Sequence, residues 1–318
     1  MLLEYYDKPW DFELLDSGNG FRLEYWGGAV LMRPDPQAIW QPSLPITEWD
    51  KAWAIFKPGS EDEYGKWEIK KALPEPWRLK FMDTVLALKL SPFKHTGVFA
   101  EQAALWEWMS KKITSPKLKT PIKSHNQNFK ILHLFAYTGG ATMVLAKAGA
   151  TVTHVDASRP AITWANENYK INFSHTDKPA SHARSSSPEK DENSPKSNVR
   201  WILDDAAKFV QREIKRGQTY DGIILDPPAF GHSPSGKTWK FARDIPGLLA
   251  DCASLLSPNA RFLILNAYAT NSSALAIHNL LEDALKKRSG KLEYGELCLK
   301  QKNNRLLSTG IFARWSQD

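Results

Sequence analysis

Short apolar runs, separated by stretches of helical periodicity, fill the carboxyl-terminal part of the chain. The runs that predict buried strands lie at 131–135, at 199–203, at 220–225, at 261–265 and in a run that closes at Asp156. Helices are predicted between them, for example at about 160–172 and 247–256, and two closing strands at 293–300 and 308–315. Because strands alternate with helices, we predict an α/β, doubly wound and mainly parallel sheet that is covered on both faces.

Residues 1–80 follow a different pattern, in which short β-type runs are separated by glycine-rich turns. Examples are 21–26 and 29–32, with Gly27 and Gly28 between them. Seven of the 13 tryptophans lie in this segment, which suits either a small aromatic core or a surface on which bases stack. Because Trp and Tyr more often fill a core, we predict a small β-rich module with an aromatic interior.

Three further segments set the predicted domain organisation. A strand is expected at 81–90, and after a Trp-containing helix a polar, basic connector is expected at 111–129. Residues 174–198 are rich in Ser, Pro and charge and cannot bury enough apolar surface to offset the entropy of ordering, so we predict a disordered insertion. The chain is therefore divided into the module at 1–80 and a larger domain at 81–318.

Composition narrows the protein class only slightly. The 42 Lys and Arg against 35 Asp and Glu give a net charge of +7, which suits a polyanionic partner but is common among soluble proteins. Cys252 and Cys298 are too few for a disulfide framework and lack the spacing of metal ligands. No signal sequence or membrane-spanning run is present, so we expect a cytoplasmic protein without a metal site. The sequence indicates no oligomeric state.

The stretch 130–156 carries the first chemical signal, since a strand ends in the turn Tyr137-Thr138-Gly139-Gly140 and the next strand ends in Asp156. In a doubly wound sheet this arrangement brings the glycine turn and the acid together where nucleosides bind. A dinucleotide needs three glycines spaced G-x-G-x-x-G, whereas only a glycine pair is present. The turn therefore fits S-adenosylmethionine better, with Asp156 on the ribose hydroxyls. A purely structural turn with a helix-capping Asp is the alternative.

A second signal is the corner Asp226-Pro227-Pro228-Ala229-Phe230, which follows the predicted buried strand 220–225. Pro228 supplies no N–H, so the Asp226 carboxylate and the Pro227 carbonyl form a pair of acceptors for the amino or ring N–H of a nucleobase. Phe230 is placed to stack on such a base. A proline turn with a solvated Asp is the structural alternative.

The two signals together resemble a known family. The chain is similar to the class I S-adenosylmethionine-dependent methyltransferases, whose sheet is Rossmann-like, and within them to the bacterial large-subunit ribosomal RNA base methyltransferases. The similar stretches are HTGVFAEQ (95–102), LHLFAYTGGATMVLAKAGA (132–150), VDASRPAITWANENYKIN (155–172), DDAAKFV (204–210) and YDGIILDPPAF (220–230). The resemblance covers roughly residues 90–315 and is specific for the cofactor but not for the substrate.

The resemblance implies a role for each matching residue. The methionine side of the cofactor is lined by Phe135, Tyr137 and Gly139. The ribose and adenine are held by Asp156, Ala157, Ser158 and Asp205. Phe99 and Gln102 close over the cofactor, and the acceptor base is held by the catalytic set Asp226, Pro227 and Phe230.

One departure from part of that group concerns cysteine. Enzymes that methylate carbon 5 of cytosine use a cysteine nucleophile, expected in the loop after 261–265, but that loop reads Asn266-Ala267-Tyr268-Ala269-Thr270. We therefore predict a nitrogen or oxygen acceptor, with Asp226 orienting it and taking its proton. Lys237 and Lys240 are placed in a loop that could meet phosphates, with a solvated loop as the equal alternative.

The preferred function is methylation of a nucleobase of RNA, with ribosomal RNA favoured. One alternative is a methyltransferase that acts on a protein or small molecule. Another is an NAD-dependent oxidoreductase or a non-catalytic nucleotide-binding module.

Overall fold

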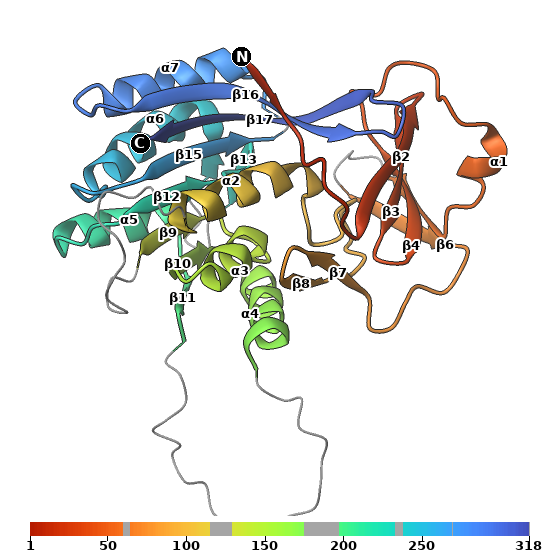
Figure 1. The fold of residues 1–318 in the computed structure, drawn as a ribbon, viewed down its shortest axis with the longest axis horizontal. Helices are drawn as coiled ribbons and strands as arrows, with labels where there is room; N and C mark the ends of the chain where they lie inside the picture. Colours follow the sequence, from red (N-terminus) through yellow and green to blue (C-terminus); the bar gives the residue numbers. More distant parts are fainter. Residues whose placement is uncertain (60–63, 115–128, 175–196, 233–237, 269, 318) are drawn as a thin grey trace, which may run out of the picture.

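The computed structural model describes residues 1–59, 64–114, 129–174, 197–232, 238–268 and 270–317, and for His232 the backbone only. Two β-sheets dominate the molecule, with the large sheet at one end and the amino-terminal sheet at the other (Figure 1). The predicted insertion at 174–198 lies almost wholly outside the described residues. Of the predicted connector at 111–129, residues 115–128 lie outside them, whereas residues 111–114 are helical, so the start of the connector was predicted too early. None of the described helices is long and apolar enough to cross a membrane.

The large sheet has eight strands in the order β1-β16-β17-β15-β12-β9-β10-β11. Their bounds are β1 (Leu2–Glu4), β16 (Lys291–Lys300), β17 (Leu306–Ser316), β15 (Phe262–Ala267), β12 (Gly222–Leu225), β9 (Lys130–Leu134), β10 (Thr151–Asp156) and β11 (Val199–Leu203). Only the pairs of β17 with β15 and with β16 are antiparallel. The predicted doubly wound, Rossmann-like α/β fold is confirmed.

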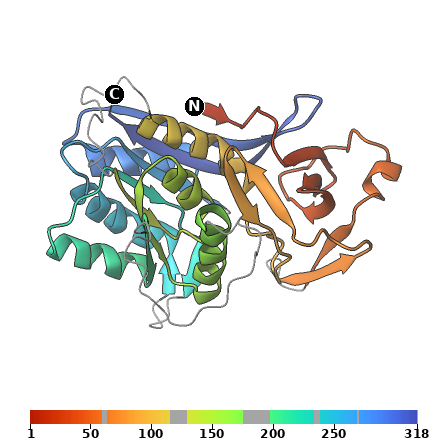
Figure 2. The ribbon, with the colours of Figure 1, turned by 60° about the horizontal axis from the view of Figure 1, so that its bottom comes forward.

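Helices cover both faces of this sheet (Figures 1 and 2). One face packs on α2 (Ala103–Thr114), α3 (Gly140–Lys147) and α4 (Arg159–Phe173). The other packs on α5 (Ala206–Lys215), α6 (Phe241–Ser254) and α7 (Ala274–Leu285). Successive residues of β9 alternate between the two cores, since Ile131 belongs to the first and Leu132 to the second. A strand buried on both faces explains the continuous apolar runs in the sequence.

Helix α6 begins six residues before the helix predicted at 247–256. Pro246 and Gly247 suggested a later start, because both residues disfavour a helix interior. Phe241, Ile245 and Leu248 nevertheless share one buried helical face, and their burial outweighs the local preference.

The amino-terminal part forms a five-stranded sheet of β2 (Phe12–Gly18), β3 (Phe21–Trp26), β4 (Ala29–Pro34), β5 (Ala54–Pro58) and β6 (Gly65–Ile69), with the short helix α1 (Ile46–Trp49). A hairpin of β7 (Arg78–Phe81) and β8 (Thr84–Ala87) follows. The strand expected at 81–90 is present as β8 but is shorter, because the chain turns at Met82, where φ is 51°. Trp26, Trp49 and Trp77 are buried, as an aromatic core requires. The domain boundary at residue 80 stays a prediction, and β1 pairs with the large sheet.

The amino-terminal sheet is joined to the large sheet through the buried carboxylate of Asp16. Its Oδ1 accepts a hydrogen bond from Gln301 Nε2 at 2.9 Å, at the tip of the β16–β17 hairpin. Its Oδ2 accepts from the backbone N–H of Leu44 at 2.8 Å and from Trp49 Nε1 at 3.1 Å. Ser17 completes the link by donating to Gln301 Oε1 at 2.6 Å. One carboxylate thus organises a loop of the amino-terminal part and its contact with the sheet.

Replacing Asp16 by Ala should lower the free energy of unfolding by about 3 kcal/mol, because several buried donors lose a charged acceptor at once. Urea unfolding followed by tryptophan fluorescence measures this loss. Asp50→Ala, at an exposed carboxylate of the same region, is the matched control and should change stability by less than about 0.5 kcal/mol. A similar, small effect of both substitutions would contradict the proposed role of Asp16.

Candidate active site

The predicted site residues gather at one edge of the large sheet. Leu134, Val155 and Leu225 occupy corresponding positions near the ends of three neighbouring parallel strands, and Leu265 continues the row on β15. The segments that follow these strands therefore meet at the carboxyl edge, where doubly wound sheets bind ligands. They include the glycine turn, the acid at the end of β10 and the corner after β12.

The glycine turn has an unusual backbone conformation. The backbone φ angles of Phe135, Tyr137 and Gly139 are 55°, 51° and 81°. These values lie in the left-handed region, which residues other than Gly rarely adopt. The Asp156 carboxylate accepts one hydrogen bond from the Tyr137 N–H at 2.7 Å and another from the Ser158 N–H at 2.8 Å. Asp156 therefore holds the turn in this conformation and connects it to the start of α4.

The carboxylate of Asp156 still has acceptor capacity for a ligand, because each oxygen has two lone pairs and accepts one of these bonds. Burial raises the pKa of Asp156, and the two backbone N–H groups act in the opposite direction. Ala157 is half-buried, whereas Ser158 is exposed and caps α4 by accepting from the Ala161 N–H at 3.3 Å. The structural role of Asp156 is thus compatible with the predicted ribose contact, which stays a prediction.

Asp205 lies next along the same edge, after β11. Its side chain caps α5 by accepting from the Lys208 N–H at 2.9 Å. The N–H of the preceding Asp204 donates to the Asp156 carbonyl at 3.1 Å, which brings the ends of β10 and β11 together. Asp205 is therefore close to the predicted adenine end of the site, although its contact with the adenine amino group is untested.

Two buried histidines lie beneath the glycine turn. The Thr142 hydroxyl lies 2.8 Å from His133 Nδ1 and 3.0 Å from His154 Nδ1. Burial lowers the pKa of His133 to about 3 and holds that of His154 well below its ordinary value. These imidazoles are uncharged and act as packing groups for the turn.

The upstream segment, defined as residues 94–102, lies across the glycine turn. The Thr138 hydroxyl donates to the Gly97 carbonyl, and the Phe99 ring lies 5.7 Å from the Tyr137 ring. Gly97 has φ of 93°, and a Cβ there would come within 2.2 Å of Trp164. Only glycine lets the segment approach so closely. Phe99 is consequently beside the predicted methionine end of the site.

The upstream segment also reaches the corner after β12. Gln102 Nε2 donates a hydrogen bond to Asp226 Oδ2 at 2.6 Å. Burial raises the pKa of Asp226 to about 6, and the bond from Gln102 partly opposes this effect. A residue predicted to cover the cofactor is thus bonded to the residue predicted to hold the acceptor.

The corner itself is fixed by an aromatic residue that the sequence did not single out. Trp239 Nε1 donates to the Pro228 carbonyl at 2.8 Å, and its ring lies 5.2 Å from that of Phe135. Pro227 is buried beside Asp226, whereas the Phe230 side chain is 53% exposed. The structure therefore brings Asp226 and Pro227 to the site, and the stacking role of Phe230 stays a prediction.

Sequence reasoning also missed residues that surround the upstream segment. The Tyr268 ring lies 6.1 Å from Phe99 and 6.0 Å from His95. From the amino-terminal sheet, Arg33 forms a two-point ion pair with Glu24 and donates to the Lys94 carbonyl at 2.9 Å. The loop containing Tyr268 was considered only for its lack of cysteine, and no periodic signal marks Arg33.

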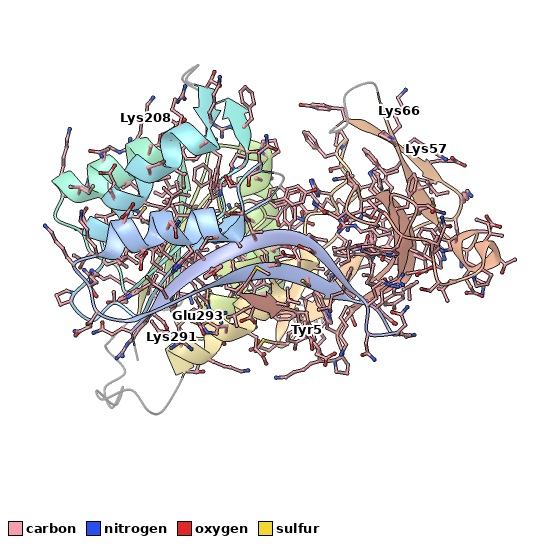
Figure 3. All side chains as sticks on the ribbon, turned by 90° about the horizontal axis from the view of Figure 1, so that it is seen from above. Tyr5, Lys57, Lys66, Lys208, Lys291 and Glu293 are labelled. Atoms are coloured by element: carbon pink, nitrogen blue, oxygen red, sulfur yellow. The ribbon has the colours of Figure 1, made fainter. Side chains whose placement is uncertain are left out.

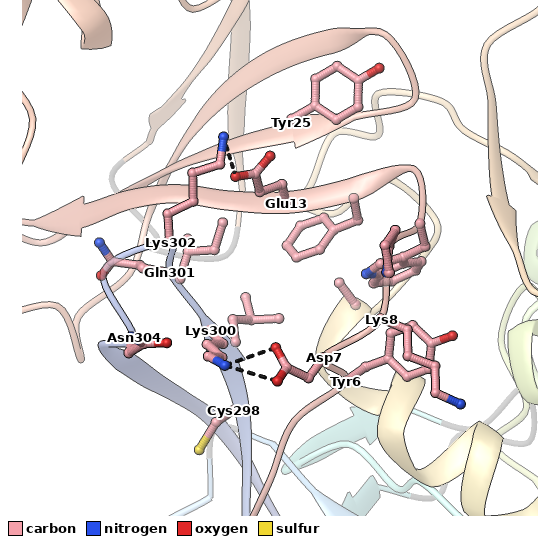
Figure 4. Close-up of a pocket in the computed structure, with 16 residues that line it drawn as sticks. Tyr6, Asp7, Lys8, Glu13, Tyr25, Cys298, Lys300, Gln301, Lys302 and Asn304 are labelled. Atoms are coloured by element: carbon pink, nitrogen blue, oxygen red, sulfur yellow. Dashed lines mark hydrogen bonds and ion pairs between the residues drawn. The ribbon is translucent and has the colours of Figure 1, made fainter.

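A cavity of about 410 Å³ lies elsewhere, between the amino-terminal residues and the end of β16 (Figure 4). Two ion pairs join residues that line this cavity: Lys300 pairs with Asp7, and Lys302 pairs with Glu13, each at 2.9 Å. None of the predicted site residues lines it. We therefore place the active site at the carboxyl edge of the sheet rather than in this cavity.

Comparisons with known proteins bear on the family to which the chain belongs. No family model matches the chain. Among curated proteins, the ribosomal RNA large subunit methyltransferases K/L of Shewanella frigidimarina and Hahella chejuensis are each 28% identical, over 64% and 54% of this chain. The chain spans only 24% and 19% of their lengths, about a fifth to a quarter.

Solved structures give a match over nearly the full chain. The protein SMU.776 complexed with SAH has a TM-score of 0.67 at 16% identity, covers 97% of this chain and 76% of its own, and shows the fold alone. The SAM-dependent methyltransferase of Agrobacterium tumefaciens is 36% identical with a TM-score of 0.85, and the match covers 99% of this chain and 93% of that one. The chain therefore belongs to the class I S-adenosylmethionine-dependent methyltransferases, and S-adenosylmethionine is its cofactor.

Proposed function

We propose that the chain methylates a nucleobase of RNA, with ribosomal RNA as the favoured substrate, and that it does so without a cysteine nucleophile. The observation that carries the proposal is the hydrogen bond between Gln102 and Asp226. It joins the residues predicted to hold the methyl donor to a carboxylate whose pKa of about 6 allows it to accept a proton near neutral pH. The names of the curated relatives favour ribosomal RNA as the substrate class.

The residues at the glycine turn fit the cofactor. Asp156 has free lone pairs for two ribose hydroxyls, and Gly139 adopts the left-handed φ of 81° that the turn requires. Phe99 and Tyr137 offer ring surfaces to the methionine side, and burial raises the Tyr137 pKa to about 12, so its phenol is neutral. When bound, the cofactor supplies an activated methyl group on a sulfonium.

The chain's own residues then orient the acceptor and manage its proton. In our proposal Asp226 accepts a hydrogen bond from the N–H of the base, which aims the nitrogen at the methyl group. The nitrogen would form its bond to the methyl carbon as the carbon–sulfur bond of the sulfonium breaks, and it would release its proton to the Asp226 carboxylate. Each carboxylate oxygen has two lone pairs, so Asp226 can accept from the base while its Oδ2 keeps the bond from Gln102.

Both cysteines are unsuited to act as nucleophiles. Cys252 is buried on α6, and Cys298 is buried on β16, where it lines the cavity that none of the predicted site residues reaches. Burial raises the pKa of both thiols, that of Cys298 to about 12, so neither forms a thiolate near neutral pH. An acceptor nitrogen, which needs no covalent activation, fits this set of residues better than a ring carbon.

The net positive charge of the chain does not indicate which surface would bind RNA. Figure 3 places Lys208 on α5 and Lys57 and Lys66 on the amino-terminal sheet, at opposite ends of the molecule. Lys240 is exposed at the end of β14 (Thr238–Lys240), and Lys237 lies outside the described residues. The proposal therefore rests on the chemistry of the acceptor corner rather than on a basic surface.

Nucleoside mass spectrometry of ribosomal RNA from cells with and without the gene tests the proposal. One methylated nucleoside should disappear when the gene is deleted and return when it is restored. A complete set of methylated nucleosides in the deletion strain would favour a protein or small-molecule substrate instead. The oxidoreductase alternative is set aside because the chain is a methyltransferase.

Two isosteric substitutions should separate donor binding from methyl transfer. Asp156→Asn should weaken binding of S-adenosylhomocysteine at least tenfold, since it alters an acceptor of the turn and of the ribose. Asp226→Asn should leave that affinity within about threefold but lower methyl transfer at least 100-fold, as loss of a general base does. Isothermal titration calorimetry and transfer of labelled methyl groups measure the two effects. Equal weakening of cofactor binding by both variants would contradict this division.

The pKa of Asp226 also makes a prediction about stability. Its pKa is raised from 3.8 to about 6, so folding favours the protonated form, and stability falls as the pH rises through this window. Asp226→Asn removes this effect. The free energy of unfolding of the variant, relative to that of the wild type, should therefore rise by about 2 kcal/mol from pH 4 to pH 7, after allowance for partial solvent screening.

Urea unfolding of both proteins at pH 4 and at pH 7 measures these free energies. The effects of other titrating groups are the same in both proteins and cancel in the difference between them. A difference that does not change with pH would show that Asp226 titrates normally in the folded protein.

A further inference from the structure

The side chain of Tyr268 lies at the carboxyl edge of the sheet, one strand away from Asp226. Leu265 of β15 pairs with Leu225 of β12, so the residues that follow these strands emerge side by side. Tyr268 comes directly after the end of β15, and Asp226 directly after the end of β12. The two residues thus flank the same part of the site.

Aromatic rings line this part of the site on the side of the upstream segment. Phe99 lies between the Tyr137 ring at 5.7 Å and the Tyr268 ring at 6.1 Å. His95 lies 4.8 Å from Phe99 and 6.0 Å from Tyr268. We call His95, Phe99 and Tyr268 the aromatic wall. Because Phe99 and Gln102 are on the same segment, the wall stands next to the bond between Gln102 and Asp226.

Aromatic rings beside a carboxylate can hold either a planar base or a cationic side chain, and the surrounding charges distinguish these two ligands. The pKa of His95 is held well below its ordinary value, first by burial and then by Arg33, Lys94 and Arg22, so the imidazole is uncharged. Lys94 Nζ lies 5.7 Å from the centre of the Tyr268 ring. The wall is therefore neutral, with a cation already at its edge.

The arginines nearby are matched with carboxylates, and burial raises the pKa of Glu101, a further acid of the upstream segment, to about 7. Arg33 pairs with Glu24 at 2.6 Å, and Arg22 pairs with Glu24 and Asp35 at 3.3 Å. Within the described part of the chain, Lys94 makes no ion pair. A lysine or arginine side chain entering the wall would be repelled by Lys94, whereas a neutral base attached to a phosphate would meet a complementary charge.

We propose that Tyr268 is the stacking surface for the acceptor base, and that Lys94 contacts the phosphate of that nucleotide. The acceptor is then a neutral, planar nucleobase held between the wall and Asp226, not the amine of a protein side chain. This inference rests on the proposed RNA substrate and extends it by naming the residues that select the base.

The test measures transfer of labelled methyl groups to total large-subunit ribosomal RNA purified from cells that lack the gene. Tyr268→Leu keeps apolar volume but removes the ring, so kcat/KM should fall by about 5- to 150-fold, as expected for a lost stacking contact. Tyr268→Phe keeps the ring and should retain most of the rate. Affinity for S-adenosylhomocysteine should stay within about twofold in both variants, which a merely structural role for Tyr268 would not allow.

Two further variants complete the design. Tyr294 stacks on His278 at 4.6 Å and is half-buried like Tyr268, so Tyr294→Leu is the matched control and should behave as the wild type. Lys94→Gln should reduce the slope of log affinity against log salt by about 0.7, the value for one phosphate contact on a single strand. Filter binding of the same RNA from 50 to 300 mM salt measures this slope.

The experiments distinguish a failure of the proposed function from a failure of the stacking role of Tyr268 alone. Absence of methyl transfer to RNA by the wild-type protein overturns the proposed function, and the inference with it. Transfer by the wild type that Tyr268→Leu leaves unchanged overturns the stacking role alone. Equal losses in Tyr268→Leu and Tyr268→Phe would assign the effect to the hydroxyl, and would likewise overturn the stacking role.

Discussion

The site depends on one carboxylate that meets two backbone N–H groups. Asp156 accepts from Tyr137 and Ser158 at 2.7 and 2.8 Å, within the range of charge-assisted hydrogen bonds. These bonds offset the cost of left-handed φ at Phe135 and Tyr137, of the order of 1–3 kcal/mol for each residue. Without them the turn would lose the conformation that directs the Tyr137 ring toward Phe99. The same residue that is predicted to bind the ribose therefore builds the surface next to it.

The upstream segment connects this turn with the acceptor corner. Thr138 bonds to the Gly97 carbonyl on the predicted donor side, and Gln102 bonds to Asp226 on the predicted acceptor side. The amino-terminal sheet holds the beginning of the segment through the bond from Arg33 to the Lys94 carbonyl. A β-rich part that could appear separate in the sequence thus braces the segment that spans both halves of the site. Asp16 and Gln301 fix the orientation of that part against the large sheet.

Much of the fold could be predicted from the sequence, because its signals are local. Continuous apolar runs indicated strands buried on both faces, and the glycine pair and the Asp226-Pro227 corner followed such strands directly. The start of α6 was missed because burial of Phe241 and Ile245 outweighs the local effect of Pro246. Pairing of β1 with β16 was missed because three residues carry too short a pattern to indicate a strand.

Contacts between segments that are far apart in the sequence could not be predicted from the periodicity of apolar residues. Gln102 and Asp226 are 124 positions apart, and Arg33 and Lys94 are 61 apart. No spacing rule relates such residues, because their meeting depends on how loops cross the edge of the sheet. Family resemblance placed Gln102 near the cofactor and Asp226 near the base, yet it did not reveal that the two side chains are bonded. The coupling of the two halves became visible only in three dimensions.

Burial of Asp226 lowers the stability of the folded protein at neutral pH and raises the pKa of this carboxyl group. A carboxylate with a pKa near 6 costs the folded protein stability at neutral pH, and its only hydrogen-bond partner among the described residues is the Gln102 amide. An arginine partner would remove this cost, but it would also lower the pKa and weaken the carboxylate as a proton acceptor. Gln102 instead gives a weaker, uncharged bond. A poorly compensated acid at this position therefore suits the proton-accepting role that we propose for Asp226.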